Sequence, residues 1–178
     1  MKYFHLVQQH QFCAAASIQM ILLRREKLVD QEEIATNLNI RVLDEQKDLY
    51  VKTFEALPKG HPLLGFKFER FKEEAIRNAL EQYGLTYTVH QYSDLTNPKE
   101  LIQTSLEEGK DVLANYFHEP INGKQNGHFV LIEELHDDLV TICDPGQNAK
   151  PRWTIKLDTL VLAMKEYNGR ERGFIIFD

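Results

Sequence analysis

The feature that most constrains the fold of this 178-residue chain is the nearly all-apolar stretch CAAASIQMILLRR at residues 13–25. Its helical spacing puts alanine, isoleucine, leucine and methionine on almost every side of the predicted helix. A helix that is apolar all round has to be covered by other elements, so we expect a buried central helix. The length suits one core, and we therefore expect residues 1–178 to form a single domain.

Further elements follow from spacing and from their boundary residues. A capping-box pattern, Asp30 with Glu33, predicts the start of a second helix, and apolar spacing predicts another over 69–83, ended by Gly84. Residues 44–57 are weakly helical, and residues 58–65, rich in proline and glycine, predict a loop. Afterwards the pattern predicts strands at 86–92, 112–117, 127–134, 139–143 and 174–177, with helices at 97–108 and 157–167. Helices first and a mostly antiparallel sheet afterwards indicate an α+β fold with the first helix packed on the sheet.

Charge and hydropathy limit the classes of partner. The formal net charge of −6 gives no global basic field, which argues against nucleic acid as a partner. The arginine pairs Arg24-Arg25 and Arg170/Arg172 have acidic neighbours, so we expect them on a solvated face. We see no secretory signal and no apolar run long enough for membrane insertion, and we expect a cytoplasmic protein.

Two cysteines, Cys13 and Cys143, are the only ones in the sequence. They do not match a disulfide framework, and no close Cys or His pairs indicate zinc; we expect no cofactor and no metal. Cys13 begins the buried helix, where unpaired N–H groups and the helix dipole favour an anion, and the thiolate is the nucleophilic form. Position alone equally allows an inert buried cysteine.

His128 is the best candidate for the base that a cysteine nucleophile needs. It opens the predicted strand GHFVLIEEL after the polar residues 119–127, which places it at the edge of a cleft. For the remaining histidines we expect solvent exposure or a structural hydrogen bond; they are His5, His10, His61, His90, His118 and His136.

Asp144 is the candidate for orienting the base, and hairpin register decides whether it can. A three-residue loop at 136–138 puts Val130 opposite Asp144, so that His128 is a diagonal neighbour at roughly 7–8 Å on the same face. A two-residue loop at 137–138 turns Asp144 away, unless a bulge intervenes. In either case Cys143 points to the face opposite Asp144, and we interpret it as a packing residue.

An oxyanion hole needs a donor beside the nucleophile, which a side-chain amide together with the backbone N–H of Cys13 would supply. Gln8, Gln9 and Gln11 all precede Cys13 closely, and the residues alone do not choose among them.

Two blocks, QQHQFCAAASIQMIL at residues 8–22 and GHFVLIEELHDDLVTICDP at 127–145, resemble the papain-like superfamily. The resemblance is to the double-glycine leader peptidases of bacterial bacteriocin exporters and their stand-alone relatives. It implies a papain-like fold, with Cys13 as nucleophile, His128 as general acid/base, Asp144 as orienter and Gln8 as oxyanion-hole donor.

The chain departs from that family pattern at three positions. Phe12 and Ala14 stand where the family often has an acidic residue and a glycine, and its glutamine usually stands where this chain has Val7. An aromatic residue before the cysteine is similar to the phytochelatin-synthase-like relatives.

These observations lead to a cysteine hydrolase that cleaves a peptide or amide bond through a thioester on Cys13. Two alternatives stay open: acyl transfer to an amine or thiol acceptor, and a catalytically silent module that binds a peptide. In each case the expected partner is a peptide or peptide-like substrate, in a cleft walled by residues 59–68 and 119–127. The sequence does not indicate an oligomeric state.

Overall fold

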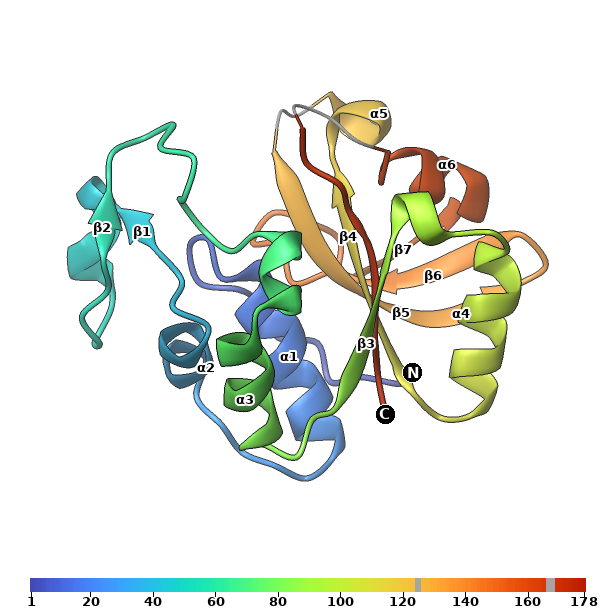
Figure 1. Ribbon diagram of the computed structural model, residues 1–178, viewed down its shortest axis with the longest axis horizontal. Helices are drawn as coiled ribbons and strands as arrows, with labels where there is room; N and C mark the ends of the chain where they lie inside the picture. Colours follow the sequence, from blue (N-terminus) through green and yellow to red (C-terminus); the bar gives the residue numbers. More distant parts are fainter. Residues whose placement is uncertain (124–125, 166–168) are drawn as a thin grey trace.

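The computed structural model describes residues 1–123, 126–165 and 169–178. Helices α1 (Cys13–Arg24), α2 (Gln31–Asn37) and α3 (Glu74–Glu81) come first, and most of the sheet follows (Figure 1). The described strands of this sheet lie in the order β3 (Tyr87–Gln91), β8 (Gly173–Phe177), β4 (Asp111–Phe117), β5 (Gly127–His136), β6 (Leu139–Cys143) and β7 (Arg152–Lys156). Every neighbouring pair is antiparallel, so the predicted α+β class is confirmed.

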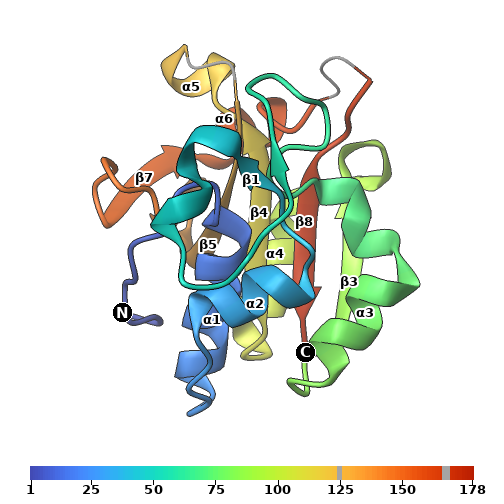
Figure 2. The same ribbon diagram turned by 90° about the vertical axis from the view of Figure 1, so that its left-hand side faces the viewer.

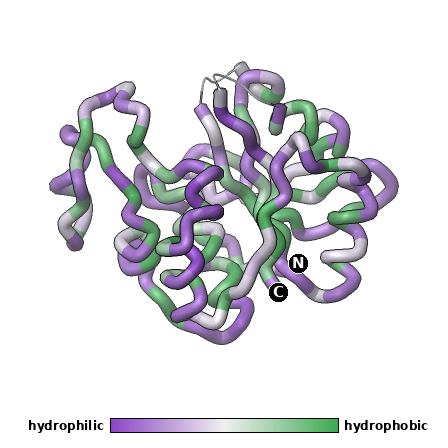
Figure 3. Tube along the Cα trace, viewed as in Figure 1, coloured by the Kyte–Doolittle hydropathy of each residue, from purple (hydrophilic) through white to green (hydrophobic). Residues whose placement is uncertain are grey.

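Helices cover both faces of the sheet (Figures 1 and 2). Alternation along β5 sends Phe129 and Leu131 into one core with α1, and Val130 and Ile132 into a second core with α4 (Pro98–Glu107) and α6 (Leu157–Leu162). Figure 3 shows hydrophobic colour along the central strands, where these cores meet, and also in the helices. The predicted central helix is confirmed, because eight of the twelve residues of α1 are buried.

The capped helices begin where the sequence predicts. The Asp30 carboxylate accepts hydrogen bonds from the backbone N–H groups of Glu32 and Glu33, and the Asn97 side chain caps α4 in the same way.

The predicted helix over 69–83 is wrong in its first turn. The chain forms a 3₁₀ helix at Phe68–Lys72, and Glu73 is extended before α3 begins. The Arg70 guanidinium binds both the Glu73 carboxylate and the carbonyl oxygens of Leu38 and Asn39, which holds this break in place.

Three further expectations need correction, and one strand was not predicted. Within residues 44–57 only Asp44–Leu49 is helical, as a 3₁₀ helix, and β2 (Ala56–Leu57) pairs in parallel with β1 (Val42–Leu43), which precedes this segment. Helix α5 (Glu119–Asn122) occupies part of the expected loop 119–127, and β7 was not predicted. Helix α6 ends at Leu162, and its predicted end at Tyr167 lies outside the described residues.

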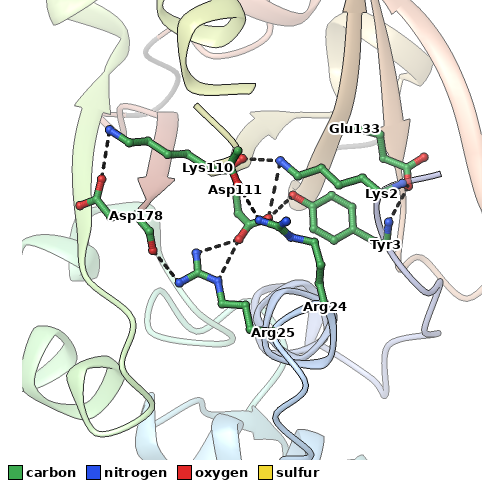
Figure 4. Close-up of polar contacts among 9 residues, drawn as sticks. Lys2, Tyr3, Arg24, Arg25, Lys110, Asp111, Glu133 and Asp178 are labelled. Atoms are coloured by element: carbon green, nitrogen blue, oxygen red, sulfur yellow. Dashed lines mark hydrogen bonds and ion pairs between the residues drawn. The ribbon is translucent and has the colours of Figure 1, made fainter. Parts of the chain in front are cut away.

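Asp111, at the start of β4, is fully buried and holds three parts of the chain together (Figure 4). Its carboxylate accepts hydrogen bonds from the Tyr3 hydroxyl at 2.7 Å, Arg24 Nε at 2.9 Å and Arg25 Nη2 at 2.8 Å. Arg25 also donates to the backbone oxygen of Asp178. Arg24 is exposed and Arg25 half-buried, so the expected solvated face agrees for Arg24; in addition, both arginines pair a buried carboxylate, which the sequence did not predict.

Candidate active site

Cys13 is the first residue of α1 and is partly exposed. No side chain caps this helix end, because the N-cap residue is Phe12. The Phe12 ring is fully buried and packs on Tyr50 at 4.9 Å and Phe54 at 5.1 Å between ring centroids. The aromatic packing fixes the residue before Cys13, and the first N–H groups of α1 stay free of a side-chain acceptor.

A β-bulge sets the position of Asp144. The β5–β6 hairpin turns through two residues, Asp137 and Asp138, because His136 pairs with Leu139; of the two loop lengths considered, the two-residue loop is the one present. The register shifts between Ile132 and Glu134, so that Leu131 pairs with Cys143. The bulge thus returns Asp144 to the sheet face of His128. With a two-residue loop, only such a bulge could place Asp144 there.

The bulged residue, Glu133, is itself buried and polar. Its carboxylate accepts hydrogen bonds from the backbone N–H groups of Lys2 and Tyr3 and from Arg152 Nε at 2.6 Å. These bonds hold the pKa of Glu133 below its ordinary value, against the opposing effect of burial. Glu133 therefore ties the segment that leads to Cys13 to strand β7.

His128 and Asp144 are hydrogen-bonded at 2.6 Å between Nε2 and Oδ1. Only 7% of His128 and 3% of Asp144 is exposed. The carboxylate also accepts from the backbone N–H of Gly146 at 2.8 Å and from the Trp153 indole N–H at 2.9 Å. Burial opposes ionisation of Asp144, but its hydrogen bonds, that from His128 first, hold its pKa below the ordinary range.

His128 also lies close to Cys13 on the wall of the same cavity, and its pKa reflects both neighbours. Burial acts to lower this pKa; the hydrogen bond to Asp144, the proximity of the Cys13 thiol and the negative charges of both raise it to about 9. The imidazole thus lies between the thiol and the carboxylate. Of the predicted site residues, the structure brings these three together.

Sequence reasoning missed the groups that surround His128. The His118 ring is stacked on the His128 ring at 5.0 Å, and the Tyr116 ring meets it edge-on at 5.9 Å. Tyr116 also pairs with His128 across β4 and β5. Trp153, the only tryptophan in the chain, donates to Asp144 from β7. Alternation of side chains along β4 and the residue after it could have placed Tyr116 and His118 on the sheet face of His128. Trp153 could not be placed, because its strand, β7, was not predicted.

Two other histidines make structural hydrogen bonds with backbone groups. His5 Nε2 is hydrogen-bonded to the Asp144 carbonyl oxygen at 2.8 Å, and the His61 ring nitrogen accepts from the N–H of Leu63. Cys143 is fully buried against Met20, 3.8 Å between sulfur atoms, as expected of a packing residue. Burial raises the pKa of Cys143 to about 11.

The structure narrows the choice of glutamine. Gln8 and Gln11 line the same cavity as Cys13, and Gln9 does not. The Gln8 backbone is fixed by a 2.8 Å hydrogen bond from its N–H to the Pro145 carbonyl oxygen. Among the described residues its buried side-chain Oε1 has no hydrogen-bond partner, and the same holds for Gln9 and Gln11.

Two cavities flank His128. The first, of about 570 Å³, is lined by Cys13, Gln8 and His128, by residues 60–69 as expected, and by 170–172. The second, of about 650 Å³, lies on the other side of His128 and is lined by Tyr116, Asp144, Trp153 and 146–150. The exposure expected for Arg172 is wrong: only 7% of this residue is exposed, and it lines the first cavity.

In the part of the chain that the structure describes, no group of three or more His, Cys, Asp or Glu side chains could hold a metal ion. Likewise, no described helix is long and apolar enough to cross a membrane.

Comparison with known proteins gives a sequence family and similar solved structures, two of which are described below. The sequence profile of the Peptidase_C39 like family matches residues 1–171. A protein of Bacillus anthracis, presumed to be a C39-like peptidase, has 14% identity and a TM-score of 0.63 over 97% of this chain and 93% of its own, which is a likeness of fold. A double glycine motif protease from an AMS/PCAT transporter, solved in complex with the leader peptide, has 16% identity and a TM-score of 0.45 over 99% of this chain and 91% of its own.

No curated protein sequence matches the chain. The family profile, however, spans nearly all of it, and the α+β fold agrees with that of the Bacillus anthracis protein. The chain therefore belongs to the Peptidase_C39 like family.

Proposed function

We propose that this protein is a cysteine peptidase with Cys13 as nucleophile, His128 as general acid/base and Asp144 as the residue that orients His128. The observation that supports it is the 2.6 Å hydrogen bond between His128 and Asp144, together with Cys13 on the same cavity wall and close enough to raise the pKa of His128. A base held between nucleophile and carboxylate is the arrangement that activates a thiol.

In the first step the Cys13 thiolate attacks the carbonyl carbon of the scissile amide, and the carbonyl oxygen takes the negative charge. The Cys13 backbone N–H and the Gln8 side-chain amide, which lines the same cavity, would donate hydrogen bonds to that oxygen. His128, as imidazolium, protonates the leaving nitrogen while the C–N bond breaks. The acyl group then remains on Cys13 as a thioester.

In the second step His128, now neutral, removes a proton from water, and the resulting hydroxide attacks the thioester. The C–S bond breaks, the acid is released, and the proton on His128 restores the initial pair. Asp144 keeps Nε2–H directed at itself, so the other ring nitrogen faces Cys13 throughout.

Alkylation of the native protein tests the nucleophile, with Cys143 as the internal control. We expect iodoacetamide to label Cys13 selectively, because Cys143 is buried and its pKa is raised to about 11. Replacing His128 by Ala should slow labelling of Cys13 and leave that of Cys143 unchanged.

Cleavage of a peptide library tests the reaction. Cys13→Ala should abolish turnover and Cys143→Ala should preserve it, with product formed in the absence of any added amine or thiol acceptor. Equal labelling of the two cysteines, or full turnover by Cys13→Ala, would refute the proposal.

A further inference from the structure

The cavity that Cys13 lines carries an unusual set of charges. Lys67, Arg170 and Arg172 line it together with two carboxylates, Glu69 and Glu171. Within the described residues, no ion pair within 4.0 Å joins any of these five side chains to a charged partner. The cations at this site are therefore not neutralised by direct contact.

Arg172 is the most buried of these cations, with 7% of its surface exposed. Its guanidinium lies over the Phe117 ring, 4.8 Å from the centroid, and donates one hydrogen bond, at 3.2 Å, to the Arg170 carbonyl oxygen. Burial lowers the pKa of Arg172. A buried guanidinium has five N–H donors, and a nearby carboxylate is the acceptor that best matches their planar geometry.

Arg172 also stands next to the candidate catalytic histidine. A side-chain carbon built on Gly127, the residue before His128, would lie 3.6 Å from Arg172 Nε. Because Gly127 has no side chain, the Arg172 guanidinium stays accessible to a peptide substrate that lies beside His128.

Lys67 supplies a second positive charge in the same cavity. It is partly buried, and its ammonium group makes no hydrogen bond or ion pair with another described residue. Burial and the positive charge of Arg170 lower the pKa of Lys67, and the negative charges of Glu69 and then Cys13 partly offset that effect. A half-buried ammonium without a partner is unfavourable, and a bound anion would remove that cost.

The positions of the two cavities indicate on which side of the scissile bond the positive charge of Lys67 and Arg172 acts. The acyl group must remain on Cys13, which lines the 570 Å³ cavity and not the 650 Å³ cavity. The leaving group is protonated by His128, which lines both. The acyl portion therefore occupies the cationic cavity, and the leaving portion the cavity beside Trp153.

We propose that Lys67 and Arg172 form an anion-binding subsite that selects peptides with an aspartate or glutamate shortly before the scissile bond. This inference rests on the proposed function, since it assigns a substrate class to the same site. Arg172 binds the carboxylate through two N–H groups, and Lys67 adds a charge-assisted hydrogen bond.

Matched peptides test the subsite directly. Each of the four positions before the scissile bond is varied between Glu and Gln, which differ in charge but hardly in shape, and between Asp and Asn. At one of them we expect kcat/KM to be about tenfold or more higher for the acid, as charge-assisted hydrogen bonds predict. The preference should fall as salt is added.

Variants then assign the preference to residues. Lys67→Met and Arg172→Gln should each reduce it several-fold, while Lys52→Met, at an exposed lysine outside both cavities, should not. If Arg172→Gln does not fold, Lys67→Met alone decides, because the Lys67 ammonium has no hydrogen bond or ion pair with another described residue that would be lost.

Three results would overturn the subsite: cleavage with no preference for the acid at any position, a preference for the amide, or a preference that Lys67→Met leaves intact. Each of these leaves the proposed peptidase standing. In contrast, cleavage of no peptide, together with Cys13 labelled no faster than Cys143, refutes the peptidase and the subsite with it.

Discussion

Replacing Asp144 by Asn tests the assignment of His128 most sharply, because it removes the charge and keeps the shape. A pKa of about 9, against the ordinary 6.5, corresponds to about 3 kcal/mol of preferential stabilisation of the imidazolium. Asp144 and Cys13 share that effect, and a hydrogen bond to a charged group contributes on the order of 1 to 2 kcal/mol, which Asp144→Asn should remove. The His128 titration midpoint should therefore fall toward 6.5 in Asp144→Asn.

The same shift predicts how stability depends on pH. A group whose folded-state pKa is raised stabilises the fold fully below its unfolded value, 6.5, and that contribution is lost as pH rises through about 9. Asp144→Asn should therefore lower the melting temperature by about 3–6 °C more near pH 6 than near pH 10. Loss of the acceptor for the Trp153 N–H costs stability at both pH values, so the difference isolates His128.

Imidazole NMR and thermal melts at the two pH values provide the measurements. Asp138→Asn is the matched control: Asp138 lies in the turn of the same hairpin, its side chain is 77% exposed, and it pairs with Lys99. An unchanged His128 midpoint, with equal destabilisation at the two pH values, would refute the reasoning.

Four further outcomes are expected. The alkaline limb of kcat/KM should lie near pH 9, where His128 loses the proton that the leaving group needs; a pH-independent rate above 9 would contradict this. Trp153→Phe keeps the ring but removes the N–H, and kcat should fall about tenfold, measured against an unchanged fold by circular dichroism. Glu133→Gln should lower the melting temperature and the rate together, because it loosens the segment leading to Cys13; a change in rate alone would be inconsistent. Gln8→Ala should reduce kcat about a hundredfold, with KM little changed, whereas Gln11→Ala should not, and the reverse result would exchange their assignments.

Local signals predicted the helices best. The apolar pattern of α1 and the caps at Asp30 and Asn97 are encoded within a few neighbouring residues, and the structure has them in place. The break at Glu73 was missed because it depends on Arg70 reaching the carbonyl groups of α2 and its following turn, a contact distant in sequence.

The site was predicted unevenly for the same reason. Cys13 and His128 follow from a helix start and a strand start, which local sequence patterns indicate. Asp144 depended in addition on the register of the hairpin. The bulge was left open because register is a property of two strands; Glu133, a polar residue at a core-facing position between Leu131 and Leu135, was its one local sign. The cations of the cavity come together only through folding, since Lys67 and Arg172 are far apart in sequence.

The buried carboxylate of Asp111 has a practical consequence for handling the protein. It binds Tyr3 and, through Arg25, the backbone of Asp178 at the end of β4 that is opposite to Tyr116. Tyr3 and Asp178 therefore lie about 17 Å or more along the strand from His118 and His128. A surface tether or fluorescent reporter can thus be attached at either end, at Met1 or Asp178, while both cavities stay open to substrate. Single-molecule or immobilised assays of cleavage are therefore compatible with this architecture.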